Sequence, residues 1–225
     1  GVLLQWTPSK VGTGYIVDRY VDTTNSWQPI STINGVSNVA YQDTGATYGT
    51  TNHYRVRIMG ANALTNSTAI YAIDPSKPVV ALTYDDGPHP SVTHDILDVL
   101  EKYNAKATFF VVGSRVNEYK DCIVREARLG CEIGNHTYSH TILTSASDST
   151  INSQIESTND TVEKLTGIRP AIVRPPGGST SSRVKSVVNY PLVNWSVDTL
   201  DWKNRNSSSV VSSVKNNVRD GSIVL

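Results

Sequence analysis

Two adjacent carboxylates follow an apolar segment in the stretch ALTYDDGPHP, residues 81–90. Residues 79–84 have the composition of a buried strand, which ends at Asp85 and Asp86 because Gly87 and Pro88 favour a turn. Neighbouring carboxylates repel each other, so they need a cation, a shared proton or free water. The stretch therefore indicates either a cation site or a solvated surface turn.

Two histidines, His136 and His140, lie four residues apart in the segment HTYSH. If this segment takes a helical turn, both rings lie on one face and can bind one metal ion. Two histidines and one aspartate form a familiar catalytic metal set that leaves positions open for water and substrate. One of the paired aspartates would then bind the ion, and the other would be free to activate a water. The alternative is a solvated turn.

Two later segments carry residues suited to the same chemistry. A guanidinium on Arg174 could pair with the free aspartate and keep it ionised and oriented. The Pro175-Pro176 pair would stiffen this loop, and Gly177-Gly178 would let a substrate approach a backbone N–H that stabilises an oxyanion. Asp201-Trp202 closes a second polar segment. The alternatives are a surface ion pair, an ordinary turn, and a helix start with a buried indole.

The elements that must position these residues alternate between strand and helix from residue 79 onward. Parallel strands in a barrel or an open sheet follow from such alternation, so the predicted fold class is α/β. Four of the first five strands end in the residues described above, and parallel strands bring such ends to one rim. The predicted strands are 79–84, 107–113, 131–137, 171–178, 192–198 and one from 222; the predicted helices are 91–104, 117–130, 149–167, 181–190 and 207–221.

Residues 1–73 have a different sequence pattern, in which short runs of strand-forming residues are separated by clusters of turn-forming residues. This spacing is typical of an all-β sandwich. The segment resembles a fibronectin type III module whose first strand would precede residue 1, with Trp6 as its core tryptophan. Residues 74–78 are predicted to be a linker. We expect the sandwich to be a spacer, with glycan binding through Trp27 or Tyr20 as the alternative.

The amino-acid composition limits the classes of partner and the cellular location that we expect. The chain has 20 basic and 20 acidic side chains, which argues against nucleic acid or an anionic membrane surface as the main partner. No apolar run approaches the ~20 residues that span a bilayer, so no membrane span is expected. Abundant Ser, Thr and Asn with only 18% charged residues favour a secreted or cell-surface protein. Cys122 and Cys131 could form one disulfide or remain free.

Four segments together resemble the motifs of the NodB-homology polysaccharide deacetylases, carbohydrate esterase family four. They are TYDDG at 83–87, HTYSH at 136–140, RPPGG at 174–178 and DTLDW at 198–202, and they occur in the family's order. The resemblance covers residues 79–225 and implies a distorted (β/α) barrel. It also implies a bacterial enzyme that hydrolyses acetyl groups from a carbohydrate.

The resemblance implies three groups of site residues. The catalytic group contains Asp85 as general base, Arg174 to orient Asp85, and Asp201 to tune a histidine of a fifth motif. The metal group is expected to hold Zn²⁺, with Co²⁺ or Ni²⁺ effective in some members. Its members are Asp86, His136 and His140, and the substrate-binding group is Tyr84, Pro176, Gly177, Trp202 and Leu225.

The fifth motif, Leu-x-His, would place its leucine at Leu225 and its histidine two residues beyond. We therefore expect a deacetylase domain truncated at its C-terminal end, with the missing segment as a possible separate polypeptide partner. Losing a general acid typically costs about 10²–10⁴ in rate, so this piece alone is expected to be weak or inactive.

The expected substrate is an acetylated polysaccharide with N-acetylglucosamine units, peptidoglycan first and chitin-type glycans next. Two alternatives stay open. One is an acetylxylan esterase, because an ester and an amide pass through the same tetrahedral intermediate. The other is an inactive carbohydrate-binding protein built on a decayed barrel.

Overall fold

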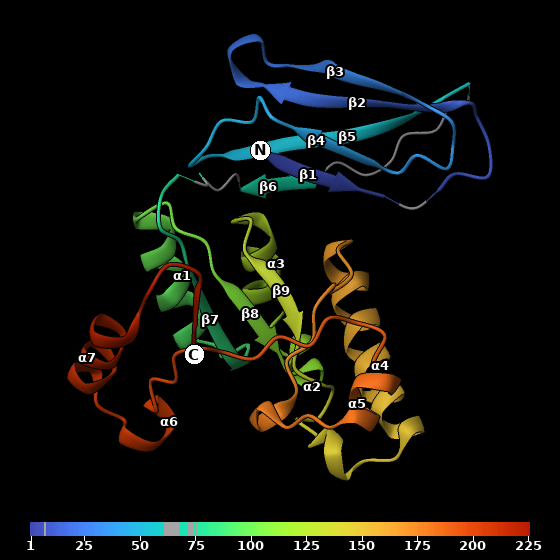
Figure 1. Cartoon of the computed structure of the whole chain (residues 1–225). Coiled ribbons are helices and arrows are strands. Elements are labelled where there is room, and N and C mark those ends of the chain that lie inside the picture. Colours follow the sequence, from blue (N-terminus) through green and yellow to red (C-terminus); the bar gives the residue numbers. More distant parts are fainter. Residues whose placement is uncertain (7, 61–67, 72–73, 75) are drawn as a thin grey trace. The chain divides into compact units, whose positions relative to one another are not determined.

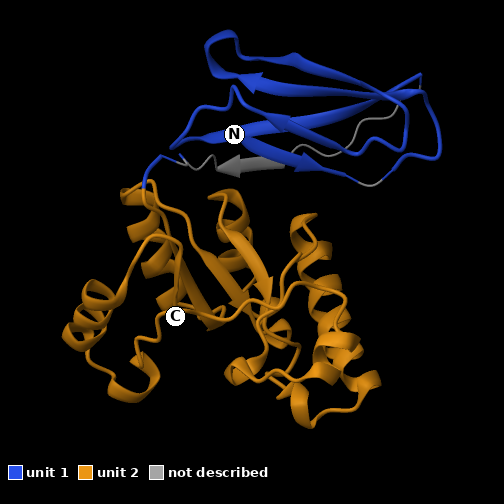
Figure 2. Cartoon of the chain, in the orientation of Figure 1, with its two compact units in different colours: residues 1–77 blue, residues 78–225 orange. Residues whose placement is uncertain are grey.

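The computed structural model describes residues 1–225 except 7, 61–67, 72–73 and 75. The chain divides into two compact units, Gly1–Lys77 and Pro78–Leu225 (Figure 2). The boundary falls inside the predicted linker at 74–78, of which residue 75 lies outside the described residues. Parts of the predicted sandwich, residues 7, 61–67 and 72–73, lie outside them as well.

Unit 1 is built from two antiparallel sheets around one apolar core. The core contains Val2 and Leu4 from the first strand and Tyr15, Val17 and Tyr54 from the second sheet. Burying such side chains contributes roughly 1.5–3 kcal/mol each. One sheet pairs β1 (Val2–Gln5) with β4 (Ala40–Asp43), and the other has the order β3 (Ser26–Asn34), β2 (Gly14–Val21), β5 (Thr51–Met59), β6 (Thr68–Tyr71), with a 3-10 turn η1 (Asp22–Thr24) after β2.

Unit 2 is organised around a parallel sheet with helices in the connections (Figure 1). Its strand order is β10 (Ser222–Val224), β7 (Val80–Gly87), β8 (Thr108–Val111), β9 (Glu132–Asn135). The predicted α/β alternation is confirmed. The helices are α1 (Val92–Lys102), α2 (Gly113–Val116), α3 (Lys120–Arg128), α4 (Asp148–Thr166), α5 (Ser182–Val187), α6 (Asp201–Asn204) and α7 (Ser207–Asn217), with 3-10 turns η2 (Leu143–Ser145) and η3 (Pro176–Gly178).

The predicted strands at 171–178 and 192–198 do not form as continuous strands. The chain there makes only single parallel bridges, between Asn135 and Val173, between Val173 and Leu192, and between Val197 and Val224. Prolines at 170, 175, 176 and 191 flank these bridges. Because proline has no N–H to donate, it stops a ladder from extending. Among the residues that the structure describes, the regular sheet of unit 2 therefore has four strands, and continuous strands do not close the predicted barrel.

Helix α4 shows how the sequence sets the scaffold beneath the sheet. The Ser147 hydroxyl caps its start by accepting from the Thr150 N–H at 3.2 Å, and Gly167, with φ 74°, ends it in the left-handed region. Ile151, Ile155 and further residues at helical spacing are buried. This face of α4 packs against α3 and β9, so it supports the strand that precedes the histidine segment.

Both cysteines, Cys122 and Cys131, are buried and free, so the disulfide considered from the sequence is not formed. Among the described residues, no helix has both the length and the apolar character needed to cross a bilayer.

Candidate active site

The paired aspartates lie at the C-terminal end of β7, where the strand is irregular. The register against β8 shifts between Asp85 and Gly87, and Asp86 takes a left-handed φ of 66°. Successive side chains of a regular strand point to opposite faces, whereas an inserted residue redirects one of them. As a result both carboxylates face one imidazole: His136 Nε2 lies 3.8 Å from Asp85 Oδ2 and 3.5 Å from Asp86 Oδ1.

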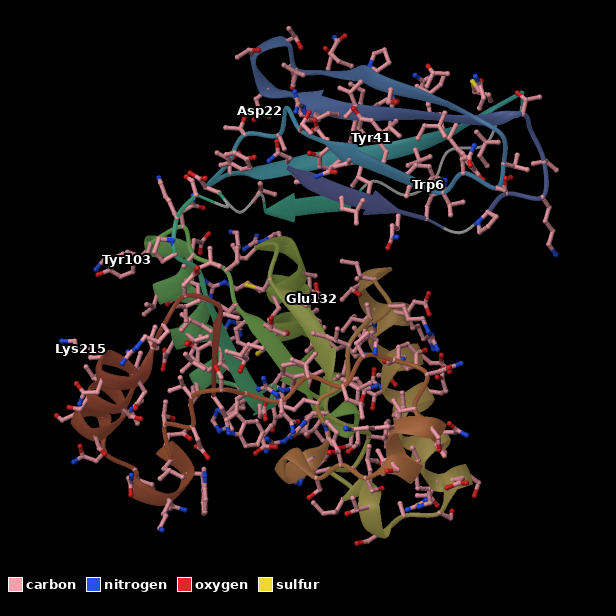
Figure 3. The ribbon with its side chains drawn as sticks, viewed as in Figure 1. Trp6, Asp22, Tyr41, Tyr103, Glu132 and Lys215 are labelled. Atoms are coloured by element: carbon pink, nitrogen blue, oxygen red, sulfur yellow. The ribbon has the colours of Figure 1, made fainter. Side chains whose placement is uncertain are left out.

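The histidine segment follows β9 directly. Figure 3 shows Glu132 at the start of this strand, so His136 lies beyond its opposite end. The segment is not helical, contrary to the condition set in the sequence analysis, because Thr137 and His140 adopt left-handed φ values of 65° and 56°. This irregular turn still brings the two rings together, with centroids 5.1 Å apart.

Three ligand atoms converge on one point. His140 Nε2 lies 3.1 Å from Asp86 Oδ1, and one donor atom each from Asp86, His136 and His140 lie within 4.8 Å of one another. The Asp86 and His140 side chains are 65% and 47% exposed, so solvent and ligands reach this point. Two imidazoles and a carboxylate with an open side fit a catalytic divalent ion such as Zn²⁺.

The protonation of His136 suits a ligand role. Its Nδ1 lies 2.7 Å from the Arg174 carbonyl oxygen, which can only accept, so Nδ1 carries the hydrogen and donates. The Nε2 lone pair is thereby left facing the aspartates. Burial lowers the pKa of His136, against the opposite effect of Asp85, and a low pKa favours the neutral ring that binds metals.

Arg174 is fully buried and holds the other aspartate. Its Nη1 donates to Asp85 Oδ1 at 2.8 Å and to Thr83 Oγ1 at 2.7 Å. Its remaining N–H groups reach the carbonyls of Val193 at 3.0 Å and Asn194 at 3.2 Å. Burial raises the pKa of the Asp85 carboxyl, while electrostatic interactions with the His136 ring and with the Arg174 guanidinium oppose that rise.

A surface pocket adjoins the convergent donors. Its lining residues come from the end of β7, from the start of α2 and from the histidine segment. Arg115 borders it and donates from Nη1 to the Asp86 carbonyl at 2.8 Å, which fixes the irregular backbone there. Arg115 was not predicted, because it belongs to no motif. The pocket is lined by Asp86, Val112, Ser114, Arg115, Ser139 and His140.

Three of the five predicted substrate-binding residues lie close in sequence to the catalytic motifs. The Tyr84 side chain stacks on Phe109 in the core, with ring centroids 5.3 Å apart, so only the Tyr84 backbone can face the site. Pro176 is buried at the start of η3. Gly177 has a φ of 63°, a conformation that favours glycine.

Three further predicted site residues, Asp201, Trp202 and Leu225, lie in the C-terminal part of the chain. Trp202 on α6 is 66% exposed, and Asp201 beside it is exposed. Leu225 continues the pairing of β10, with its N–H donating to the Val197 carbonyl at 2.9 Å. Within the described part of the chain, no hydrogen bond or ion pair links the side chains of Asp201 or Trp202 to the aspartates and histidines.

Two buried asparagines support the histidine segment and were not predicted. Asn135 accepts from the Thr137 N–H at 2.7 Å and donates to the Ile155 carbonyl and to Asn159 Oδ1, both at 2.8 Å. Both asparagines are fully buried. A signal existed in the sequence: Asn159 occupies the apolar phase of α4, four residues after Ile155, where a polar side chain needs a specific partner.

Comparison with known proteins places the chain in a family. A family model described as polysaccharide deacetylase matches residues 72–191. The chain is 44% identical over 153 residues to the peptidoglycan-N-acetylmuramic acid deacetylase PdaC of Bacillus subtilis, covering 68% of this chain and 33% of that protein. It is 42% identical over 146 residues to the peptidoglycan-N-acetylglucosamine deacetylase PgdA of Listeria monocytogenes, covering 65% of this chain and 31% of that protein. The chain thus spans about a third of the length of these curated relatives.

Solved structures agree. The structure of PdaC from Bacillus subtilis matches with a TM-score of 0.66 and 44% identity, covering 68% of this chain and 76% of that one. A family 4 acetyl xylan esterase from Clostridium thermocellum, in complex with a cobalt ion, matches with a TM-score of 0.62 and 39% identity, covering 65% and 72%. Motifs, strand-end geometry and these similarities converge, and the chain belongs to the polysaccharide deacetylase family.

Proposed function

We propose that Pro78–Leu225 form a metal-dependent deacetylase domain that hydrolyses acetyl groups from a carbohydrate polymer. The observation that carries this proposal is the convergence of Asp86, His136 and His140 beside a second carboxylate, Asp85, which a buried arginine holds. Asp86 and the two histidines would hold the ion. A divalent ion in such a set acts as a Lewis acid that polarises a carbonyl and lowers the pKa of water.

The chain's own groups supply the proton chemistry. Asp85 Oδ1 is occupied by Arg174, so Oδ2 is the oxygen left to take a proton from an attacking water. The guanidinium also keeps Asp85 charged and fixes its rotamer. Backbone N–H groups near Tyr84 and Gly177 are suited to stabilising the oxyanion. Asp201, Trp202 and Leu225 remain predicted contributors through their motifs.

We infer that the substrate carries N-acetylated sugars of peptidoglycan, which also implies an extracellular or cell-surface location. The named activities of PdaC and PgdA support this choice. An acetyl ester of xylan is the second candidate, supported by the Clostridium thermocellum esterase. An inactive role is disfavoured by the intact Asp85, Asp86, His136 and His140 set, although a Bacillus anthracis relative with 30% identity is described as a pseudoenzyme.

We further infer that the single bridges at Val173, Leu192 and Val197 mark additional, irregular strands of a distorted barrel. Unit 1, by its resemblance, would be a fibronectin type III-like spacer. Deleting residues 1–73 and measuring turnover of a soluble and of a polymeric substrate tests this role. Unchanged turnover supports a spacer, and a loss confined to polymeric substrate supports glycan binding.

The decisive experiment measures acetate release by the protein carrying this chain, loaded with zinc, on chitopentaose, peptidoglycan and acetylxylan side by side. Release from peptidoglycan, abolished by a chelator and restored by zinc, supports the proposal. Release from acetylxylan alone would favour the esterase. No release from any substrate, with no retained metal, would favour the inactive binding protein.

A further inference from the structure

A second group of metal-ligating side chains lies outside the site described above. It joins the first turn of α3 to the first turns of α1, two helices that pack together. One donor atom each from His94, Asp121 and Cys122 lie within 4.8 Å of one another. None of these residues is used by the proposed deacetylase chemistry.

Asp121 and Cys122 both face the same nitrogen of His94, so the three side chains do not form a proton relay. Asp121 Oδ2 lies 2.8 Å from His94 Nε2, and Cys122 Sγ lies 3.5 Å from the same nitrogen. In a nucleophilic triad the carboxylate and the nucleophile contact opposite nitrogens of the ring, so that the imidazole can pass a proton between them. Here both contact Nε2, and the Cys122 side chain is completely buried. The geometry therefore does not suit a nucleophile.

The same geometry suits a metal ion. With metal–ligand distances of about 2.0–2.3 Å, tetrahedral coordination separates N, O and S donors by roughly 3.3–3.7 Å, so small side-chain shifts would complete the set. Thiolate and imidazole favour Zn²⁺ and Co²⁺ over Mg²⁺ or Ca²⁺. The Asp121 side chain is 74% exposed, so an ion can enter from solvent and keep a water as fourth ligand.

The charges around these three side chains are compatible with a bound cation. Arg125 is the nearby positive group, with Nη1 3.4 Å from His94 Nδ1. Its Nη2 donates to Asp98 Oδ1 at 2.5 Å and to Glu101 Oε2 at 3.0 Å, so two carboxylates neutralise this guanidinium. Because a guanidinium N–H can only donate, Nδ1 accepts from Arg125 in the metal-free form and Nε2–H donates to Asp121 Oδ2. Metal binding at Nε2 would move the ring hydrogen to Nδ1 and release the contact with Arg125 Nη1.

We propose that His94, Asp121 and Cys122 form a second, structural Zn²⁺ site that joins α1 to α3. Binding converts the Cys122 thiol to a thiolate, and the proton leaves to solvent. Cys122 Sγ also lies 3.6 Å from the carbonyl of His89, and the His89 N–H donates to Thr93 Oγ1 at 2.9 Å. Because the Cys122 S–H donates to this carbonyl, forming the thiolate would release the His89 contact, so the ion would join α1 to α3 alone. This proposal is independent of the deacetylase assignment.

Cobalt titration of the metal-free protein tests the site, because a thiolate bound to Co²⁺ gives a near-ultraviolet charge-transfer band. The first site contains no cysteine, so the band reports the second site alone. We expect the wild type to bind two equivalents of Co²⁺ and to show the band. Cys122→Ser should bind one equivalent without the band, and Cys131→Ser, a matched buried control, should keep both.

Two further variants separate the sites. Asp121→Asn changes an exposed side chain and should weaken the second site at least tenfold while circular dichroism stays unchanged. His140→Ala should remove the first equivalent and leave the band intact, and zinc should still raise the melting temperature of this variant. A folded wild type that binds Co²⁺ without the band, or a band that survives Cys122→Ser, would overturn the proposal.

Discussion

Arg174 Nη1 donates to both Asp85 Oδ1 and Thr83 Oγ1, at 2.8 and 2.7 Å, from a guanidinium with no exposed surface. This pair joins the end of β7 to a segment 89 residues later in the chain. Asp85 is largely shielded as well, with 15% of its side chain exposed. The proposed base is therefore held by a buried ion pair.

Replacing Arg174 with alanine should destabilise unit 2. The Asp85 carboxylate would then be buried without its partner, and breaking a buried pair in this way typically costs about 3–5 kcal/mol. Urea unfolding measures this loss. Asp85→Asn in the same background should recover part of it, because the uncompensated charge is gone. Equal stability of Arg174→Ala and the wild type would contradict the buried-pair interpretation.

Replacing Asp85 with asparagine should lower acetate release by about 10²–10⁴, because a general base is lost. Metal content should stay unchanged, since Asp85 is not in the proposed ligand set. The matched control is Asp95→Asn, which changes an exposed aspartate on α1 and should keep full activity. A loss of metal together with activity would assign Asp85 to the ligands instead.

Replacing Asn135 with alanine should reduce metal affinity by about 10–100-fold, the effect typical of groups that orient ligands. Asn135 accepts from the Thr137 N–H and so fixes the turn that carries both histidines. Equilibrium competition with a chromogenic chelator measures the affinity. Asn152→Ala on the exposed side of α4 is the control, and it should bind metal normally.

Glu126 should make the free energy of unfolding depend on pH. Burial raises its pKa to about 8, and neither carboxylate oxygen has a hydrogen-bond partner in the described structure. An acid whose pKa is raised on folding binds more protons when folded, so stability should fall as pH rises from its ordinary value of 4.5 to about 8. The stabilisation from the protonated Glu126 is fully present below pH 4.5 and is lost above about pH 8.

Replacing Glu126 with glutamine should flatten this dependence, and melting temperatures recorded from pH 5 to about 9 measure it. The loss expected in the wild type is on the order of a few kcal/mol. Glu118→Gln, at an exposed position, should leave the profile unchanged. A wild-type profile that is flat across this window would show that Glu126 is solvated or paired in solution.

Much of the scaffold could be predicted from the sequence, because local patterns dictate it. Strand–helix alternation predicts β7, β8 and β9 with their intervening helices, since each apolar period is continuous and bounded by turn residues. The prediction of continuous strands near Val173 and Leu192 was wrong. The flanking prolines, which were visible in the sequence, interrupt the pairing of strands that the apolar composition would otherwise favour.

The site could be predicted only in outline. Residue types and spacing predict His136, His140 and one of the paired aspartates as metal ligands, and the family resemblance selects Asp86. The turn that brings the two rings together depends on Asn135. That contact comes from tertiary packing, in which Asn135 also donates to the Ile155 carbonyl on α4. Arg115 at the pocket had no sequence signal, because a partly exposed arginine on a short helix cannot be told from other solvated residues by its sequence context.

The irregularity at Asp86 makes the end of β7 sensitive to chain length rather than to side-chain chemistry alone. Deleting Gly87 would place Asp86 opposite Val111 in strict alternation and send one of the two acids to the other side of the sheet, away from His136. A variant one residue shorter would keep every functional side chain and still lose their meeting point. Spacing at this position therefore constrains the site as strongly as the identity of the acids themselves.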